Sequence, residues 1–234
     1  AGRRGLDVEM NYFGSAGAYR RLLAENGIVS SNIVSSKWRR YFDLRNFIDI
    51  PFFVIGLIQA FWKVFWLMPD VLLSKGGPGA LPVVLAAKFY RIPILVHESD
   101  SVPGITNGIS AKYASRIAIS FASAADYLPE KKRDVIALTG NPVRNFLVSG
   151  ESINQSTAKK FLGFDPEIPL ILILGGSQGS ASVNDFFFDA APELLRDFQI
   201  FHQTGSKNFE IAKQELNSIS KKLGEREKSR YKLA

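Results

Sequence analysis

A glycine-rich turn at residues 174–180, Leu-Gly-Gly-Ser-Gln-Gly-Ser, is the clearest candidate for chemistry in this sequence. It follows an apolar run typical of a strand and precedes a segment typical of a helix. Glycines let a backbone approach a ligand closely, and a helix N-terminus offers free N–H groups and a partial positive charge. This combination suits a phosphate or diphosphate, with the Ser177 hydroxyl and the Gln178 amide as further donors. A tight connection without a ligand is the bland alternative.

Other motifs do not fit this turn. It lacks the Gly-Lys-Ser/Thr of an ATPase P-loop and the G-x-G-x-x-G of a dinucleotide site. Three further turns also follow strand-like runs: residues 74–79 (SKGGPG), 96–107 (VHESDSVPGITN) and 139–144 (TGNPVR). Because ligands of open α/β sheets bind beyond the carboxyl ends of the strands, we expect all four turns to converge on one cleft.

The polar residues of these turns each allow two interpretations. His97 either takes part in chemistry or only hydrogen-bonds the loop backbone. Glu98 and Asp100 either take part in chemistry or cap the helix that begins near residue 103. Asn107 either lines the cleft or is an amide inside a helix. Arg144 follows a Gly-Asn-Pro turn, which favours a phosphate or base contact over a free surface cation.

Short apolar runs alternate with helix-like segments along the chain, which predicts parallel βαβ units and an α/β fold. The run at 170–174 lacks polar alternation, which is typical of a strand buried on both faces. At His202, in the run at 199–203, we expect a structural role. The predicted strands are 6–12, 33–35, 71–74, 92–96, 116–119, 135–138, 170–174 and 199–203, and the predicted helices are 16–26, 80–90, 103–114 and 180–197.

The polar stretch at 148–156 predicts a domain boundary. We therefore expect two Rossmann-like lobes, residues 1–146 and residues 147–234. The chain does not begin with methionine, and residues 225–234 show no pattern of a closing helix or strand. We expect a fragment whose second lobe is truncated and which alone does not catalyse a reaction.

Composition excludes several classes of site. The chain has no cysteine and two histidines, which excludes disulfides and thiolate metal centres and argues against a multi-histidine site. We see no acidic cluster for a divalent metal, and we expect no cofactor. The net charge of +7 suits anionic partners. A nucleic-acid partner is not expected, because the aromatic residues gather in an apolar segment and not on a basic face.

That apolar segment occupies residues 50–69. The stretch between Pro51 and Pro69 is shorter than the roughly 20 residues that cross a bilayer, and Lys63 would lie in hydrocarbon. Spanning is therefore disfavoured, which leaves a helix buried all round or one that lays a face on a membrane surface. The interleaved basic and aromatic residues at 37–42 (KWRRYF), followed by Arg45, favour the membrane surface.

Five motifs occur in an order and spacing that resemble the MurG family of transferases. They lie at residues 74–77 (SKGG), 97–107 (HESDSVPGITN), 140–144 (GNPVR), 175–179 (GGSQG) and 202–205 (HQTG). The resemblance covers nearly the whole chain. It implies a GT-B fold, with two Rossmann-like lobes and parallel sheets. It also implies transfer of N-acetylglucosamine from UDP-N-acetylglucosamine to lipid I, forming lipid II of peptidoglycan synthesis.

The resemblance also implies roles for particular residues. Asn107, Arg144, Ser177 and Gln178 would bind UDP-N-acetylglucosamine. The family's usual base, a histidine in a first glycine-rich loop, would precede residue 1, so His97 and Glu98 are local candidates for a catalytic role. The segment at 37–68 would hold the protein on an anionic membrane surface at the cytoplasmic face, as a peripheral protein.

The implied chemistry is an inverting transfer without a metal. A hydroxyl of the acceptor sugar attacks the anomeric carbon while UDP leaves, and the N–H groups at 176–179, together with Arg144, would stabilise the charge on the departing diphosphate. Two alternatives stay open on the sequence alone. One is a GT-B transferase with another acceptor, and the other is an inactive membrane-bound remnant.

Overall fold

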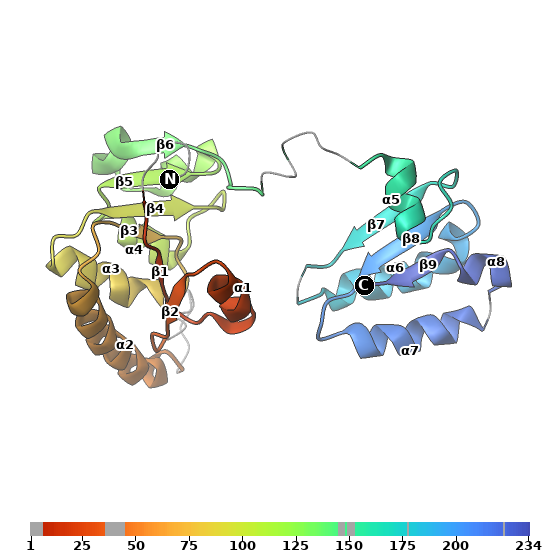
Figure 1. Ribbon diagram of the computed structural model, residues 1–234, viewed down its shortest axis with the longest axis horizontal. Coiled ribbons are helices and arrows are strands. Elements are labelled where there is room, and N and C mark those ends of the chain that lie inside the picture. The colour runs from red at the N-terminus through yellow and green to blue at the C-terminus, as the bar shows by residue number, and fades with distance from the viewer. Residues whose placement is uncertain (1–6, 36–44, 145–147, 149–152, 177, 222) are drawn as a thin grey trace. The chain divides into compact units, whose positions relative to one another are not determined.

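The computed structural model describes residues 7–35, 45–144, 148, 153–176, 178–221 and 223–234, with side chains in the long second helix from residue 49 onward (Figure 1). The chain forms two compact units, Ala1–Pro142 and Val143–Ala234. Each unit combines parallel strands with helical crossovers, which is the Rossmann-like α/β architecture.

Unit 1 contains two parallel sheets. Strands β1 (Asn11–Phe13) and β2 (Val29–Ser31) form one sheet, and a second sheet has the order β3-β4-β5-β6. The strands of the second sheet are β3 (Leu72–Ser74), β4 (Ile94–Glu98), β5 (Arg116–Ile119) and β6 (Ile136–Leu138). The helical elements are η2 (Gly17–Tyr19), α1 (Arg20–Glu25), α2 (Arg45–Leu67), α3 (Ala80–Phe89), α4 (Ile105–Ala111), η3 (Ala122–Tyr127) and η4 (Glu130–Val135).

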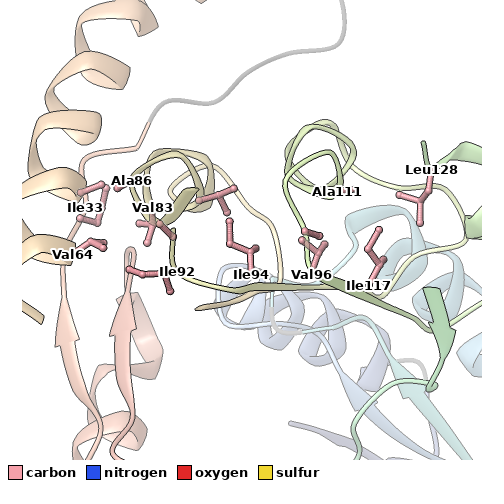
Figure 2. Packing of buried hydrophobic residues seen from close by; sticks show 14 of the residues in the cluster. Ile33, Val64, Val83, Ala86, Ile92, Ile94, Val96, Ala111, Ile117 and Leu128 are labelled. Atoms are coloured by element: carbon pink, nitrogen blue, oxygen red, sulfur yellow. The ribbon is translucent and has the colours of Figure 1, made fainter. Parts of the chain in front are cut away.

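One apolar core holds unit 1 together. Figure 2 shows side chains of α2, α3 and α4 packed with those of strands β4 and β5, among them Val64, Val83, Ile94 and Ile117. Burial of such side chains stabilises a fold by about 1.5–3 kcal/mol each. The core therefore fixes the strand ends from which the polar turns of unit 1 project.

The polar stripe of helix α2 faces the segment that follows β2. Gln59 Oε1 accepts a hydrogen bond from the Val34 N–H at 2.9 Å, and Lys63 Nζ donates to the Asn32 carbonyl at 2.7 Å. A Cβ on Gly56 would collide with the Val34 carbonyl, so the glycine permits close contact between α2 and the segment after β2. At about 100° per residue Gly56, Gln59 and Lys63 share one stripe of the helix, and this stripe faces the backbone of residues 32–34.

Unit 2 has a three-stranded parallel sheet of order β7-β8-β9. Its strands are β7 (Leu170–Leu174), β8 (Gln199–Gln203) and β9 (Tyr231–Leu233). Its core joins Ile173 and Ile200 of the sheet to Phe188 of α6 and Ala212 of α7. The helices of the unit are α5 (Gln155–Phe161), α6 (Ala181–Leu194), α7 (Phe209–Ser220) and α8 (Glu225–Lys228).

The structure corrects the sequence predictions at β2 and at residues 225–234, and the strand expected at 6–12 is confined to Asn11–Phe13. The strand expected at 33–35 lies at Val29–Ser31, and Ile33 is instead a buried core residue in the segment before α2. Residues 225–234 form α8 and β9, because the Gly224 N–H donates to Glu227 at 2.8 Å and the last strand pairs with β8. Both elements are too short to show a hydrophobic period.

Strand β7 is not buried on both faces as predicted. Ile173 is buried against α6 and α7, whereas Leu172 and Leu174 are 56% and 67% exposed. Successive side chains of a strand point to opposite faces, and within the described part of unit 2 the helical core covers the Ile173 face. Helices α5 and α7 were not predicted. Asn154 caps the first of them by accepting the Ser156 N–H at 2.8 Å.

Candidate functional site

The glycine-rich turn of unit 2 connects β7 to α6, as the sequence predicts. The Gly175 N–H donates to the Gln203 carbonyl at 3.2 Å, and the Gly179 N–H donates to the Gly176 carbonyl at 3.1 Å. Gln178 is exposed on this turn, and Ser177 lies outside the described residues. The turn is therefore folded by its own backbone and by the end of the neighbouring strand.

A second glycine makes this arrangement possible. Gly179 and Gly205 both have positive φ, at +75° and +86°. A Cβ on Gly179 would collide with the Thr204 carbonyl, and a Cβ on Gly205 would collide with the backbone of Gly179. The turns after β7 and β8 thus meet backbone to backbone, with no room for a side chain between them.

The first turn of α6 is suited to an anion. The first N–H groups of a helix have no partner inside the helix, and they carry a partial positive charge. At the N-cap, Ser180 makes no side-chain hydrogen bond to these groups. The helix has 14 residues, so its dipole is well developed. A phosphate oxygen is the natural acceptor for such N–H groups.

In unit 1, Glu98 organises the turn that follows β4. Its carboxylate accepts hydrogen bonds from the Asp100 N–H at 2.9 Å and from the Gly104 N–H at 3.2 Å, and Asn107 Nδ2 donates to it at 2.9 Å. Gly104 is the N-cap residue of α4, and Glu98 itself is 2% exposed. Glu98 therefore has one of the two roles that the sequence allows, stabilising the start of the helix. It does so by accepting a hydrogen bond from the backbone N–H of the N-cap residue Gly104. Asp100 contributes its N–H, and its side chain is exposed.

His97 holds the next turn along the sheet. Its Nε2 lies 3.2 Å from the Gly140 carbonyl, which can only accept, so Nε2 carries the proton. Nδ1 is buried and has no hydrogen-bond partner among the described residues. His97 therefore connects the end of β4 to the turn at Gly140.

Asn107 lies on α4 and is 4% exposed. Its Nδ2 donates to Glu98 and, at 3.3 Å, to the His97 carbonyl. Its Oδ1 is buried and has no partner within the described part of the chain. A Cβ on Gly76 would lie 2.9 Å from this oxygen, so the Asn107 carbonyl faces the glycine turn that follows β3.

Arg144 is exposed at the end of the described segment 45–144. The turn that leads to it is held in place by Asn141, whose Oδ1 accepts from Ser120 Oγ at 2.9 Å and whose Nδ2 donates to the Ser99 carbonyl at 3.4 Å. The turns at 74–79 and 96–107 and residues 139–142 of the third turn thus meet at the carboxyl ends of the strands of unit 1, whereas Arg144 belongs to unit 2. The fourth, with Gln178, belongs to unit 2.

Sequence reasoning assigned no role to Gly205 or to Asn184, which the structure places beside the glycine turn. Gly205 comes two residues after the end of β8, and a glycine so close to a strand end is the signal that finds such a residue. Asn184 carries no comparable signal, because it sits inside a helix. Among the described residues, no group of three or more histidine, aspartate or glutamate side chains is arranged to hold a metal ion.

Comparison with known families gives two matches. Residues 2–119 match the glycosyltransferase family 28 N-terminal domain, and residues 170–230 match the glycosyltransferase family 28 C-terminal domain. The first match covers about half of the chain.

Curated relatives carry the name UDP-N-acetylglucosamine–N-acetylmuramyl-(pentapeptide) pyrophosphoryl-undecaprenol N-acetylglucosamine transferase. The protein of that name numbered 3 from Bacillus thuringiensis (strain Al Hakam) is 41% identical over 204 residues, which are 86% of this chain and 56% of the relative. The protein from Lachnoclostridium phytofermentans is 41% identical over 207 residues, which are 88% of this chain and 56% of the relative. The chain spans about half the length of these relatives.

Solved structures confirm the fold. Acinetobacter baumannii MurG superposes with a TM-score of 0.55 at 22% identity, over 100% of this chain and 58% of that one. A putative UDP-N-acetylglucosamine 2-epimerase from Listeria monocytogenes superposes with a TM-score of 0.64 at 13% identity, over 99% of this chain and 61% of that one. The predicted α/β fold of GT-B type is confirmed, and the chain belongs to glycosyltransferase family 28.

Proposed function

We propose that the protein containing this chain transfers N-acetylglucosamine from UDP-N-acetylglucosamine to lipid I, forming lipid II in peptidoglycan synthesis. The names of the curated relatives support this reaction. The observation that carries it is the turn between β7 and α6, where the cap residue makes no side-chain hydrogen bond to the first N–H groups of the helix, which suit a diphosphate.

We propose that four residues contact the donor. Ser177 and Gln178 lie in the glycine turn, where a hydroxyl and an amide add to the backbone donors. Arg144 is exposed and supplies a cation for a charge-assisted hydrogen bond to phosphate. Asn107 offers its Oδ1, which has no partner among the described residues and would accept a hydrogen bond from a hydroxyl or amide of a ligand.

The reaction joins a hydroxyl oxygen of lipid I to the anomeric carbon as the bond from that carbon to the diphosphate breaks. Negative charge grows on the leaving UDP, and donors fixed in advance around residues 176–179 stabilise it. A base accepts the hydroxyl proton. Of the two local candidates, Glu98 already accepts three hydrogen bonds, whereas His97 Nδ1 has no hydrogen-bond partner among the described residues. We therefore favour His97 for this role.

Transfer of labelled N-acetylglucosamine to a lipid I analogue by the full-length protein tests the proposal. Loss of one charge-assisted or neutral hydrogen bond to the diphosphate costs about 1–3 kcal/mol, so Ser177→Ala and Arg144→Ala should each raise the donor KM about five- to hundredfold. Ser218→Ala on α7 and Arg226→Ala on α8 are matched controls at exposed positions. Unchanged KM and kcat in both site variants would show that the assignment is wrong.

We further propose that helix α2 attaches the protein to the anionic, cytoplasmic face of the cell membrane. The stretch Asp49–Leu67 has a mean hydropathy of 1.7 and, by length and composition alone, is long enough to cross a membrane. One side of α2 is nevertheless packed on unit 1 through Ala60 and Val64. Lipid would therefore meet the opposite face, which we call the α2 apolar face: Phe52, Val54, Ile55, Ile58, Trp62, Phe65 and Trp66, all 45–69% exposed.

This face has the composition of a membrane anchor. Trp62 and Trp66 stack edge to face with ring centroids 5.8 Å apart, and indole rings favour the lipid headgroup region. The basic residues at 37–40, which the sequence predicts to contact anionic lipid, lie outside the described residues. The apolar face alone thus supports peripheral attachment in the structure.

Co-sedimentation with vesicles of phosphatidylglycerol and phosphatidylcholine tests this attachment. Removing an aromatic side chain that is half-buried in lipid costs about 1.4 kcal/mol of binding free energy. The double variant Trp62→Ser with Trp66→Ser loses two such contacts and should bind vesicles about a hundredfold more weakly. Phe161→Ser is the control, because Phe161 of unit 2 is 90% exposed and lies on another helix. Equal binding of the double variant and the control would contradict the proposal.

A further inference from the structure

A row of buried polar side chains runs beneath the glycine turn of unit 2. Tyr231 Oη lies 2.7 Å from His202 Nδ1, and His202 Nε2 lies 3.1 Å from Asn184 Oδ1. Asn184 Nδ2 donates to the Thr204 carbonyl at 3.1 Å. The three side chains come from β9, β8 and α6 and are at most 4% exposed. They join the last strand of the sheet to the helix that starts at the glycine turn.

The direction of every hydrogen bond in this row is fixed by its last member. The Thr204 carbonyl only accepts, so the Asn184 amide donates from Nδ2 and accepts at Oδ1. His202 must then donate from Nε2, which leaves Nδ1 to accept the Tyr231 hydroxyl proton. Burial lowers the pKa of His202 and raises the pKa of Tyr231, and both shifts favour these neutral forms.

The Thr204 carbonyl joins this row to the site. It lies against Gly179, where any Cβ would collide with it. Asn184 also reaches the turn through its own backbone, because its N–H donates to the Ser180 carbonyl at 2.9 Å. The Asn184 side-chain amide therefore holds the carbonyl on which Gly179 rests, and the backbone of the same residue belongs to the first turn of α6.

We propose that His202 and Tyr231 are positioning residues for the diphosphate-binding turn, acting through Asn184 and the Thr204 carbonyl. This inference rests on the proposed function of the turn. Neither side chain reaches the ligand, because both are buried beneath the turn. Their effect is to hold the Asn184 amide in one orientation, so that the N–H groups of the turn are fixed before the ligand arrives.

The test uses Tyr231→Phe, which removes the hydroxyl and keeps a ring to stack on Phe188. Loss of one hydrogen bond costs about 0.5–1.5 kcal/mol, so the donor KM of the full-length protein should rise about two- to tenfold. Ile200→Val is the matched control, since it weakens the same core beside Tyr231 by about 0.5–1.5 kcal/mol and removes no hydrogen bond of the row. Its donor KM should stay at the wild-type value.

A double-mutant cycle separates positioning from general destabilisation. If Tyr231 acts through Asn184, then Tyr231→Phe should change the donor KM by less than about 1.5-fold when Asn184 is already alanine. Hydrogen exchange at residues 175–183 gives a second readout that needs no activity. It should accelerate about two- to tenfold in Tyr231→Phe and stay unchanged in Ile200→Val.

Two results would overturn the inference. Equal KM values and equal exchange in Tyr231→Phe and Ile200→Val would show that the row only stabilises the core. Full additivity in the cycle would show that Tyr231 does not act through Asn184. A titration of the wild-type protein with UDP keeps the two proposals apart. Binding of UDP with these results removes the inference alone, whereas absence of UDP binding removes the proposed function as well.

Discussion

The two units build the turns at their strand ends in different ways. In unit 1, the turn after β4 is held by side chains, since Glu98 collects three hydrogen bonds and His97 holds the turn at Gly140. In unit 2, the turn after β7 is held by backbone, since Gly179 and Gly205 touch directly. The first arrangement occupies the Glu98 carboxylate, and in the second the cap residue of α6 makes no side-chain hydrogen bond to the first N–H groups of the helix.

This difference explains why polar residues alone are a poor guide to the site. Glu98 has the residue type of a catalytic acid or base, yet its carboxylate serves the start of α4. The glycine turn offers no charged side chain among its described residues, yet it presents the better anion site. If the contrast is correct, a side chain at Gly179 should disrupt ligand binding in unit 2, whereas a change at Glu98 should lower the stability of unit 1.

The largest effect is expected at Gly179. In Gly179→Ala the new Cβ meets the Thr204 carbonyl at a φ of +75°, so the two turns must separate. We expect UDP affinity to fall at least about a hundredfold, as for loss of about 3 kcal/mol of binding free energy. Gly176→Ala is the control, because Gly176 has nearly the same φ, +77°, but a Cβ added there would have no atom within 4 Å. Calorimetric titration with UDP compares them, and equal affinities would contradict backbone contact.

The next effect is expected at Glu98. Glu98→Gln keeps the shape but turns an NH₂ group toward N–H donors, which should destabilise unit 1 by about 2–3 kcal/mol. Thermal unfolding followed by tryptophan fluorescence reports on this unit, because all three tryptophans precede residue 142. Glu130→Gln, at an exposed position on η4, should leave the unfolding temperature unchanged. An unaltered temperature in Glu98→Gln, with kcat strongly reduced, would indicate a catalytic carboxylate instead.

The smallest effect is the pH dependence of unit 2. The pKa of His202 lies below 6.5 in the folded chain because of burial, so the unfolded chain binds more protons below that pH. Unit 2 should therefore keep its full stability above about pH 6.5. It should lose at most about 1.4 kcal/mol per pH unit as the pH falls through the folded pKa.

Hydrogen exchange of the β8 amides, measured between pH 7.5 and 5 and corrected for intrinsic rates, reports this loss. His202→Gln should remove the dependence, whereas His97→Gln in unit 1 should leave it in place. A pH slope that survives in His202→Gln would assign the titration to another group.

Much of the fold could be predicted from the sequence because long apolar runs and glycine turns are local signals. The run at 170–174 and the helix at Ala80–Phe89 were found in this way. Strand β2 was misplaced because its segment contains two pairs of apolar residues, and only pairing with β1 selects the first.

The site was harder to predict, because its decisive contacts join residues that are distant in sequence. Nothing local shows that Gly205 meets Gly179, or that Asn184 on α6 bonds to His202 on β8. The polar stripe of α2 could be read from its spacing, but its partners at residues 32–34 could not. Packing between elements, and not the character of single residues, determines these contacts.

The central claim is that the turn between β7 and α6 binds the diphosphate of UDP. An NMR titration of the ¹⁵N-labelled chain with UDP, and with uridine as the control without phosphate, tests it most directly. We predict that the amide signals of residues 175–183 shift strongly with UDP and little with uridine. Unshifted signals in this turn, or equal shifts with uridine, would contradict the claim.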